Sequence, residues 1–149
     1  MLDFHIDNQP YRIAHGMTAM HSVDAESGVD YVRVADGAAD APAIGHTAGY
    51  SIRLPDALES AASGRPISVK VIVRAAQGSD NAKFALAYST NDVGNSGWRK
   101  LEALPEWSVC AIEYNVPVMK NGNGDFVGIL PDVRGRPGVE VCFLAIHIN

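Results

Sequence analysis

The sequence predicts an all-β protein, an antiparallel jelly-roll β-sandwich with one short capping helix. Apolar and polar residues alternate with a period of two over several short segments, which is typical of strands with one face in a core and the other in water. Residues that favour turns, chiefly Asn, Gly and Pro, separate these segments. Parallel strands would need a helix between successive strands, so the single helical segment favours antiparallel pairing.

Seven segments carry the strand pattern. The first alternates Leu, Phe and Ile with Asp and His, and a central one alternates Ile and Val with Ser, Lys and Arg. The segments are 2–7, 30–34, 49–54, 67–74, 83–89, 110–116 and 139–148. The stretch 35–48, rich in Ala, Gly and Asp, predicts a long loop.

One helix is predicted at residues 55–62, between two of these strands. Acidic residues lie near its start, and Ser63-Gly64 ends it. A helix this short serves as a cap across one end of the sandwich.

The last predicted strand, 139–148, reads as apolar on both faces. A strand of that kind is covered on both sides. The cover would be the helix, a loop or a partner subunit.

Composition predicts a single domain, residues 1–149, because 47% of the residues are hydrophobic and only 19% are charged.

The net charge is −5 and the 12 basic residues are scattered, which argues against a nucleic-acid partner and against a polybasic membrane contact. No apolar run is long enough to cross a bilayer. The first residues lack a cationic start followed by an apolar stretch, so we expect no signal peptide and synthesis in the cytoplasm.

The sequence predicts no cofactor and no metal ligands. Cys110 and Cys142 lie in apolar alternating runs and are expected as buried thiols, with a disulfide between strands left open. The five histidines are dispersed. Asn121–Asp125 offers oxygen atoms at alternate positions, but Phe126 stands where an EF-hand calcium loop needs glycine.

Two catalytic interpretations fail, and the chain is not expected to be an enzyme. Gly94–Gly97 resembles the nucleophile loop of chymotrypsin-like serine proteases and His46 lies upstream, but Trp98 follows and the chain is too short for two barrels. Glycoside hydrolysis needs two facing carboxylates, and nothing makes those of Glu102, Glu106 and Glu113 converge.

A polar loop that ends in tryptophan is the strongest candidate binding site. Tryptophan offers a flat apolar plate for a sugar face, while Asn and Asp side chains offer hydrogen bonds to hydroxyl groups and Arg could pair with an acidic sugar. For Trp107 we expect packing at the sandwich edge, with its indole N–H bonded to a loop carbonyl. For the loop tryptophan, packing and binding both stay open. The candidate carbohydrate-binding residues are Tyr88, Asn91, Asp92, Asn95, Trp98 and Arg99.

The order of strand, polar loop, tryptophan and strand resembles the galactose-binding-like jelly-roll β-sandwiches of carbohydrate-binding modules. The segments that carry this resemblance are 67–75, 84–90, 98–117, 124–129 and 139–148. The resemblance implies a β-sandwich that binds carbohydrate or polysaccharide without catalysis, and a structural calcium near the termini that no residue here locates.

A second function class also fits the chain. Such modules usually belong to secreted enzymes, whereas a phage or phage-like particle protein needs no signal peptide and tolerates unpaired cysteines. The alternative is therefore a structural or accessory protein of a released particle that mediates assembly or host-surface attachment. It predicts a homo-oligomer or a virion partner.

Overall fold

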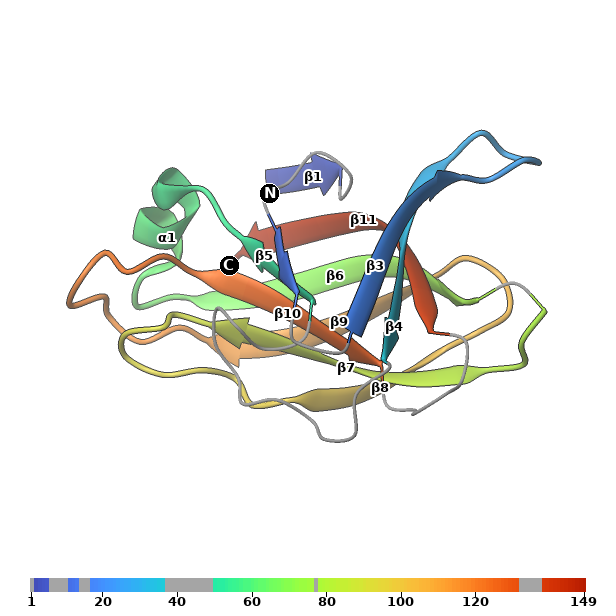
Figure 1. Cartoon of the computed structure of the whole chain (residues 1–149). Helices are drawn as coiled ribbons and strands as arrows, with labels where there is room; N and C mark the ends of the chain where they lie inside the picture. Colours follow the sequence, from blue (N-terminus) through green and yellow to red (C-terminus); the bar gives the residue numbers. More distant parts are fainter. Residues whose placement is uncertain (1, 6–10, 14–16, 37–49, 77, 132–137) are drawn as a thin grey trace.

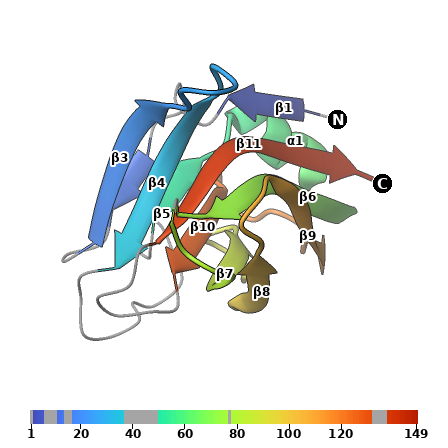
Figure 2. The ribbon, with the colours of Figure 1, turned by 90° about the vertical axis from the view of Figure 1, so that its right-hand side faces the viewer.

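Two antiparallel sheets packed face to face form the protein (Figures 1 and 2). The computed structural model describes residues 2–5, 11–13, 17–36, 50–76, 78–131 and 138–149. This architecture confirms the predicted all-β sandwich with one short helix. Within the described residues, no helix has the length and apolar character needed to cross a membrane.

Within the described residues, one sheet has six strands and the other has five. The six-stranded sheet has the order β3 (Met17–Val23), β4 (Asp30–Asp36), β11 (Val139–Ile148), β6 (Pro66–Ala75) and β9 (Ser108–Asn115), with β1 (Leu2–His5) paired to β11. The five-stranded sheet has the order β2 (Tyr11–Ile13), β5 (Tyr50–Arg53), β10 (Phe126–Pro131), β7 (Ala82–Ser89) and β8 (Arg99–Ala103). The helix α1 (Asp56–Ala62) follows β5 at one end of the sandwich (Figure 1).

Four of the strands in the described residues were not among the predicted segments. β2 is three residues long, β3 mixes Thr, His and Ser with its apolar residues, β8 is mostly charged, and β10 is buried along its whole length and so shows no alternation of polar and apolar residues. The prediction also ended the second strand too early, because β4 continues through Ala35 to Asp36 and pairs there with β3. The rest of the predicted loop, and the end of the first predicted strand at Ile6 and Asp7, lie outside the described residues.

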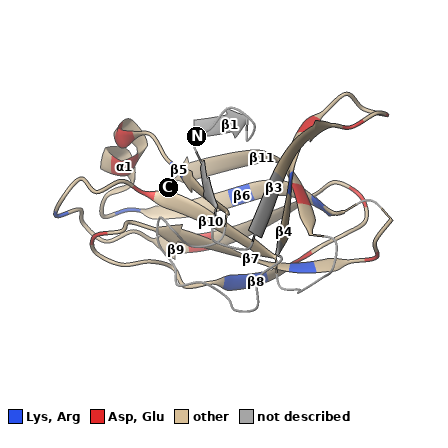
Figure 3. Cartoon of the chain, viewed as in Figure 1, with Lys and Arg blue, Asp and Glu red and all other residues tan. Residues whose placement is uncertain are grey.

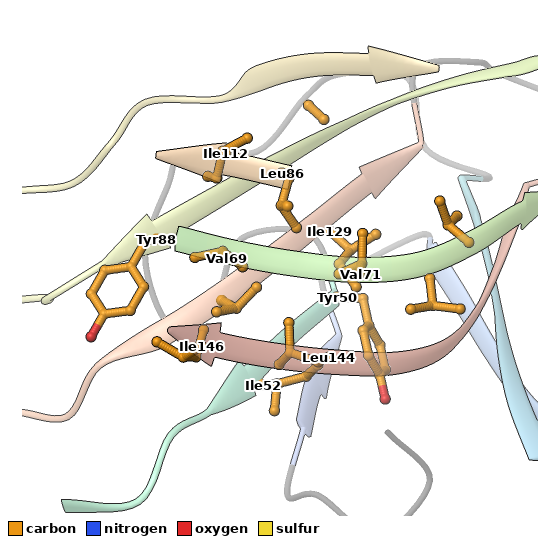
Figure 4. Packing of buried hydrophobic residues seen from close by; sticks show 14 of the residues in the cluster. Tyr50, Ile52, Val69, Val71, Leu86, Tyr88, Ile112, Ile129, Leu144 and Ile146 are labelled. Carbon is orange, nitrogen blue, oxygen red and sulfur yellow. The ribbon is translucent and has the colours of Figure 1, made fainter. Parts of the chain in front are cut away.

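The core lies between the two sheets. In the five-stranded sheet, cross-strand neighbours of β5, β10 and β7 point inward together and meet inward residues of β6 and β11 (Figure 4). Burying one such aliphatic side chain contributes about 1.5–3 kcal/mol. The labelled core residues are Tyr50, Ile52, Val69, Val71, Leu86, Tyr88, Ile112, Ile129, Leu144 and Ile146.

A β-bulge in β11 explains why this strand reads as apolar on both faces. The register of β11 against β6 shifts between Val141 and Phe143. The extra residue changes which side chains point inward, so one continuous inner face takes odd-numbered residues before the bulge and even-numbered ones after it. The bulge accounts for part of the two-sided apolar pattern. The strand is also covered on its outer side over part of its length, since Glu140 is 0% exposed and Ala145 is 3% exposed there. The fully buried residues of this inner face are Val139, Val141, Leu144 and Ile146.

The outer side of β11 holds a buried carboxylate between two arginines. Glu140 is 0% exposed and accepts hydrogen bonds from Arg33 Nη2 at 2.6 Å and from Arg74 Nε at 2.7 Å. Arg74 also lies 3.6 Å from Asp24, which the hydroxyl of Ser27 holds in a turn. This network joins β4, β6 and β11 on the outer side of their sheet.

Trp107 is a packing residue, as predicted. The guanidinium carbon of Arg74 lies 4.2 Å from its ring centroid, and Tyr31 packs beside it at 6.1 Å. The contact with Arg74 combines packing with cation–π attraction. The predicted bond from the indole N–H to a loop carbonyl is not formed, because this N–H has no partner among the described residues.

The two cysteines do not form a disulfide. Cys110 and Cys142 are free thiols and are half-buried rather than fully buried. Burial raises the pKa of both thiols. The Sγ of Cys142 lies 3.7 Å from the carbonyl oxygen of Ile72, next to the bulge.

The helix α1 closes the end of the sandwich, as predicted. It begins after Pro55, whose carbonyl accepts the backbone N–H of Leu58 at 2.9 Å, and Leu58 and Ala62 are fully buried against the core. Glu59 is buried as well, beside two apolar positions of a short helix. That position is unusual for a carboxylate.

Candidate functional site

The loop between β7 and β8 is a preformed structure. The backbone N–H of Ser96 donates to the carbonyl of Tyr88 at 2.8 Å, and the Ser96 hydroxyl accepts the N–H of Tyr88 at 2.9 Å. At the other end of the loop, the N–H of Thr90 donates to the carbonyl of Gly94 at 3.0 Å. These bonds fix the position of Trp98, which follows the loop at the start of β8.

The asparagines of this loop are exposed and partly used by the loop itself. Asn91 adopts a left-handed φ of 56°, a conformation that asparagine tolerates better than most residues. The side-chain oxygen of Asn95 accepts the N–H of Gly97 at 2.9 Å. Asn95 therefore shapes the turn, and the residue as a whole is exposed.

Trp98 lies over the outer face of the five-stranded sheet. Lys100 pairs with Ala85 across β8 and β7, and Ala85 pairs with Leu130 of β10, so these residues share one face. Side chains two residues apart in a strand lie on the same side, which adds Lys83 to this face. Together with Trp98 they line a largely apolar pocket of about 250 Å³, which we call the Trp98 pocket. Its described lining also includes Phe84 and Leu101.

Arg99 does not belong to the Trp98 pocket. Consecutive strand residues point to opposite faces. Arg99 instead lines an open pocket of about 260 Å³ with Glu113 and Tyr114, while its Nε donates to the carbonyl of Ser96 at 2.9 Å. The expectation that Trp98 and Arg99 contact one ligand on one surface is corrected by this geometry.

Tyr88 is a core residue rather than part of a binding surface. Its side chain is 0% exposed and its hydroxyl donates a hydrogen bond to Asp125. Burial first, and then the bond to Asp125, raise the pKa of Tyr88. Its inward direction follows from the strand alternation, which places it beside Leu86 on the core face.

Asp92 anchors a neighbouring loop. Its Oδ2 accepts the backbone N–H groups of Asn121 at 2.7 Å and Lys120 at 3.0 Å. The bond from Asn121 is the largest cause of a lowered pKa for this carboxyl. Asp92 therefore joins the β7–β8 loop to the chain that enters β10, and its oxygens are already engaged by the protein.

A second group of carboxylates was not predicted. Glu59 on α1, Asp92 in the loop and Asp125 before β10 all line a cavity of about 10 Å³, which we call the carboxylate cavity. Glu59 is 5% exposed and Asp125 is 2% exposed. The three residues lie far apart in the sequence, so only the fold brings them together. The sequence had indicated two of them separately, Asp92 as a candidate sugar-binding residue and Asp125 in the oxygen-rich segment 121–125, but nothing in it linked them to Glu59.

The pKa of Asp125 gives a testable pH dependence. Burial raises the pKa of this carboxyl to about 6, with Glu59 and Asp92 adding to the shift while the hydroxyl of Tyr88 opposes it. The nearby Tyr114 phenol has a raised pKa too. The folded protein therefore keeps a proton between about pH 4 and 6 that the unfolded chain has lost, so the contribution of Asp125 to stability falls as the pH rises through this window.

We expect Asp125→Asn to stabilise the protein more at pH 7 than at pH 4.5 relative to the unsubstituted chain, in buffer with EDTA. Urea unfolding of both proteins at the two pH values measures the difference. An equal effect at both values would contradict the raised pKa.

The charges of the described chain are dispersed over both sheets and the loops (Figure 3).

Solved structures of carbohydrate-binding modules share this fold, as three of them show. The xylan-binding domain CBM22-1 of Paenibacillus barcinonensis Xyn10C matches with a TM-score of 0.65 and 12% identity, over 99% of this chain and 92% of that one. The C-terminal CBM6 of the laminarinase LamC of Zobellia galactanivorans matches with a TM-score of 0.54 and 13% identity, over 98% of each chain. The module CBM6cm-2 of Cellvibrio mixtus lichenase 5A, solved with cellotriose, matches with a TM-score of 0.52 and 13% identity, over 98% of this chain and 95% of that one.

The chain has the fold of a carbohydrate-binding module. The resemblance inferred from the sequence is confirmed at the level of the fold. No protein-family model matches the sequence, and no curated protein matches it. On this carbohydrate-binding-module fold, the Trp98 pocket lies on the outer face of the five-stranded sheet and the carboxylate cavity lies at the end capped by α1.

Proposed function

We propose that the chain is a non-catalytic carbohydrate-binding module and that its ligand contacts the Trp98 pocket. The observation that carries this proposal is a half-buried tryptophan ring beside a largely apolar pocket, on a sandwich shared with carbohydrate-binding modules. An aromatic ring of this kind offers a face on which the C–H groups of a sugar can stack.

The ring face of Trp98, rather than its indole N–H, carries the proposal. The N–H is buried and has no hydrogen-bond partner among the described residues, so a ligand hydroxyl does not reach it in this structure.

Two lysines give the pocket its polar edge. Lys83 and Lys100 both line it, and neither ammonium group forms an ion pair with a described carboxylate. They are therefore available to donate to sugar hydroxyls or to pair with an acidic sugar. This role was predicted for Arg99, which faces the other way.

We expect Trp98→Ala to weaken polysaccharide binding by about 10- to 100-fold, the effect of truncating an aromatic residue at the centre of an interface. Isothermal titration calorimetry would measure binding to xylan, cellulose oligosaccharides, laminarin and alginate. Alginate as the best ligand would support pairing with Lys83 and Lys100.

Trp107→Phe is the matched control. It changes the other tryptophan, which packs under Arg74, and should leave the affinity unchanged. Unchanged affinity in a folded Trp98→Ala protein would place the binding site elsewhere. Failure of the folded, unsubstituted chain to bind any polysaccharide would contradict the proposed function.

The particle-protein alternative is not tested by the fold. The unpaired cysteines that it tolerates agree with the free thiols of Cys110 and Cys142. It stays a prediction that light scattering on the purified protein can test, because it requires an oligomer.

A further inference from the structure

The strand β9 forms one end of the six-stranded sheet and leaves one side of its backbone unpaired (Figure 2). It pairs with β6 along its whole length, from Ser108 opposite Val73 to Asn115 opposite Pro66. Within the described residues, no strand lies on its other side and no loop backbone bonds to it there. The free side of β9 is therefore a row of N–H and C=O groups, which a further strand can satisfy.

β9 lacks the features that usually protect the edge of a sheet. Those features are a short strand, lysine or proline residues, and a β-bulge. β9 is eight residues long, contains no Lys, Arg or Pro, and pairs with β6 without a shift in register. In the other sheet the end strands differ, because β2 has only three residues and β8 carries Arg99, Lys100 and Glu102.

The one charged residue of β9 does not protect this edge either. Both carboxylate oxygens of Glu113 lie within hydrogen-bond distance of the Ser68 hydroxyl, at 2.6 and 2.7 Å. Ser68 lies opposite Glu113 on β6, so the carboxylate is held toward its own sheet. The neighbours on the same face are Val109, which is 64% exposed, and the exposed Ala111. The edge thus presents small and apolar side chains on which a second strand can pack.

We propose that β9 is the contact surface for a second copy of this chain, which adds its own β9 in antiparallel orientation about a two-fold axis at Ala111. Ala111 then lies opposite the partner's Ala111, and Val109 lies opposite the partner's Glu113. Opposite residues of an antiparallel pair point to the same face, so the two six-stranded sheets continue into one. The contact uses the same surface of both copies and closes on itself as a dimer.

The position of Glu113 favours this axis. Glu113 and the partner's Glu113 are then four positions apart along the strands, about 14 Å, so no like charges meet. An axis at Ile112 would instead make the two glutamates diagonal neighbours, about 7–8 Å apart. A second copy also supplies the required strand at the concentration of the protein itself.

The dimer contact is separate from the proposed sugar site. None of the residues that line the Trp98 pocket belongs to β9. Loss of the dimer would therefore leave the proposed sugar binding unchanged, and absence of sugar binding would not affect the dimer.

Sedimentation equilibrium of the full chain tests the proposal. One strand pair is a small contact, so we expect a dissociation constant of about 10–100 µM rather than a permanent dimer. Ala111→Glu should raise this constant by about tenfold or more, because two carboxylates then meet on the axis. The new charge does not harm the monomer, since Lys70 lies opposite this position on β6.

Met20→Glu is the matched control. Met20 is 57% exposed on β3, at the other end of the same sheet, and lies opposite the basic residue Arg33. The change is of the same kind but on a different edge, so it should leave the dissociation constant unchanged.

Disulfide formation locates the axis, in a parent chain that carries Cys110→Ser and Cys142→Ser. Opposite Cα atoms of an antiparallel pair are about 4.5–5.5 Å apart, within the range that a disulfide spans. Ala111→Cys should therefore give a covalent dimer on oxidation. Val109→Cys, about 14 Å from its counterpart, should not.

Three results would overturn the proposal. The first is a monomer at concentrations well above 100 µM, the upper end of the about 10–100 µM expected for a small contact. The second is a dimer that survives Ala111→Glu or is lost in Met20→Glu, which would place the contact on another edge. The third is cross-linking that is as efficient at position 109 as at position 111.

Discussion

Glu140→Gln is expected to lower the free energy of unfolding by about 3–5 kcal/mol, the cost of removing one partner from a buried ion pair. Glu140 is 0% exposed and carries the negative charge that both Arg33 and Arg74 contact. The side chain of Arg74 is 10% exposed, so without Glu140 its remaining carboxylate partner is Asp24 at 3.6 Å, beside the rings of Trp107 and Tyr31. Its charge would then be buried with little compensation.

Urea unfolding at pH 7 measures this loss. Asp56→Asn breaks the exposed pair with Arg53 and should cost no more than about 1 kcal/mol, which makes it a matched control. Arg33→Met should cost less than Glu140→Gln, because the Arg33 side chain is 34% exposed and can be replaced by water. A loss below 1 kcal/mol for Glu140→Gln would show that the network contributes little.

Gly138→Ala is expected to destabilise the protein by about 3 kcal/mol, at the upper end of the range for overpacking. A Cβ atom at this position would lie 1.6 Å from the carbonyl oxygen of Val34 and 2.8 Å from the Cα of Ala35. Both are backbone atoms of β4, which pairs with β11 from the next residue, Val139. No side chain can move aside, so the two strands would have to separate at this point.

Gly122→Ala is the control for this prediction. A Cβ atom there would meet only the side-chain oxygen of Glu59, at 3.9 Å, and the change should stay within about 0.5 kcal/mol. Urea unfolding compares the two variants, and hydrogen exchange of the β4 amides locates the damage. Equal stability of the two variants would mean that β4 and β11 adjust without cost.

Local patterns predicted the strands in which large apolar residues alternate with polar or small ones. β6 alternates buried Ile and Val with polar residues over most of its length, and its bounds were predicted closely. β8 failed because it lies at the edge of its sheet, where charged residues such as Lys100 and Glu102 face water. Edge strands of this kind carry little hydrophobic pattern.

The candidate site was likewise predicted in part. The polar loop and Trp98 were predicted from residue types, and the structure places Trp98 at a pocket. The sheet face on which Tyr88 and Arg99 lie was not predicted, because it depends on which face of β7 and β8 meets the core. That choice buried Tyr88 and turned Arg99 away from Trp98.

The sequence by itself determined the fold class, the single capping helix and the tryptophan-bearing loop, because each depends on residues that are neighbours in the chain. The tertiary structure alone decided which residues of β11 point inward, because one inserted residue changes the alternation along the strand. It also decided which charged side chains are buried, because the segments that bury them are distant in the sequence. Glu140 between Arg33 and Arg74 is one such case, and the pair of Glu59 and Asp125, which line one cavity, is the other. A period-two pattern records only the alternation within a strand, whereas a charge is buried or compensated by whatever the fold places beside it.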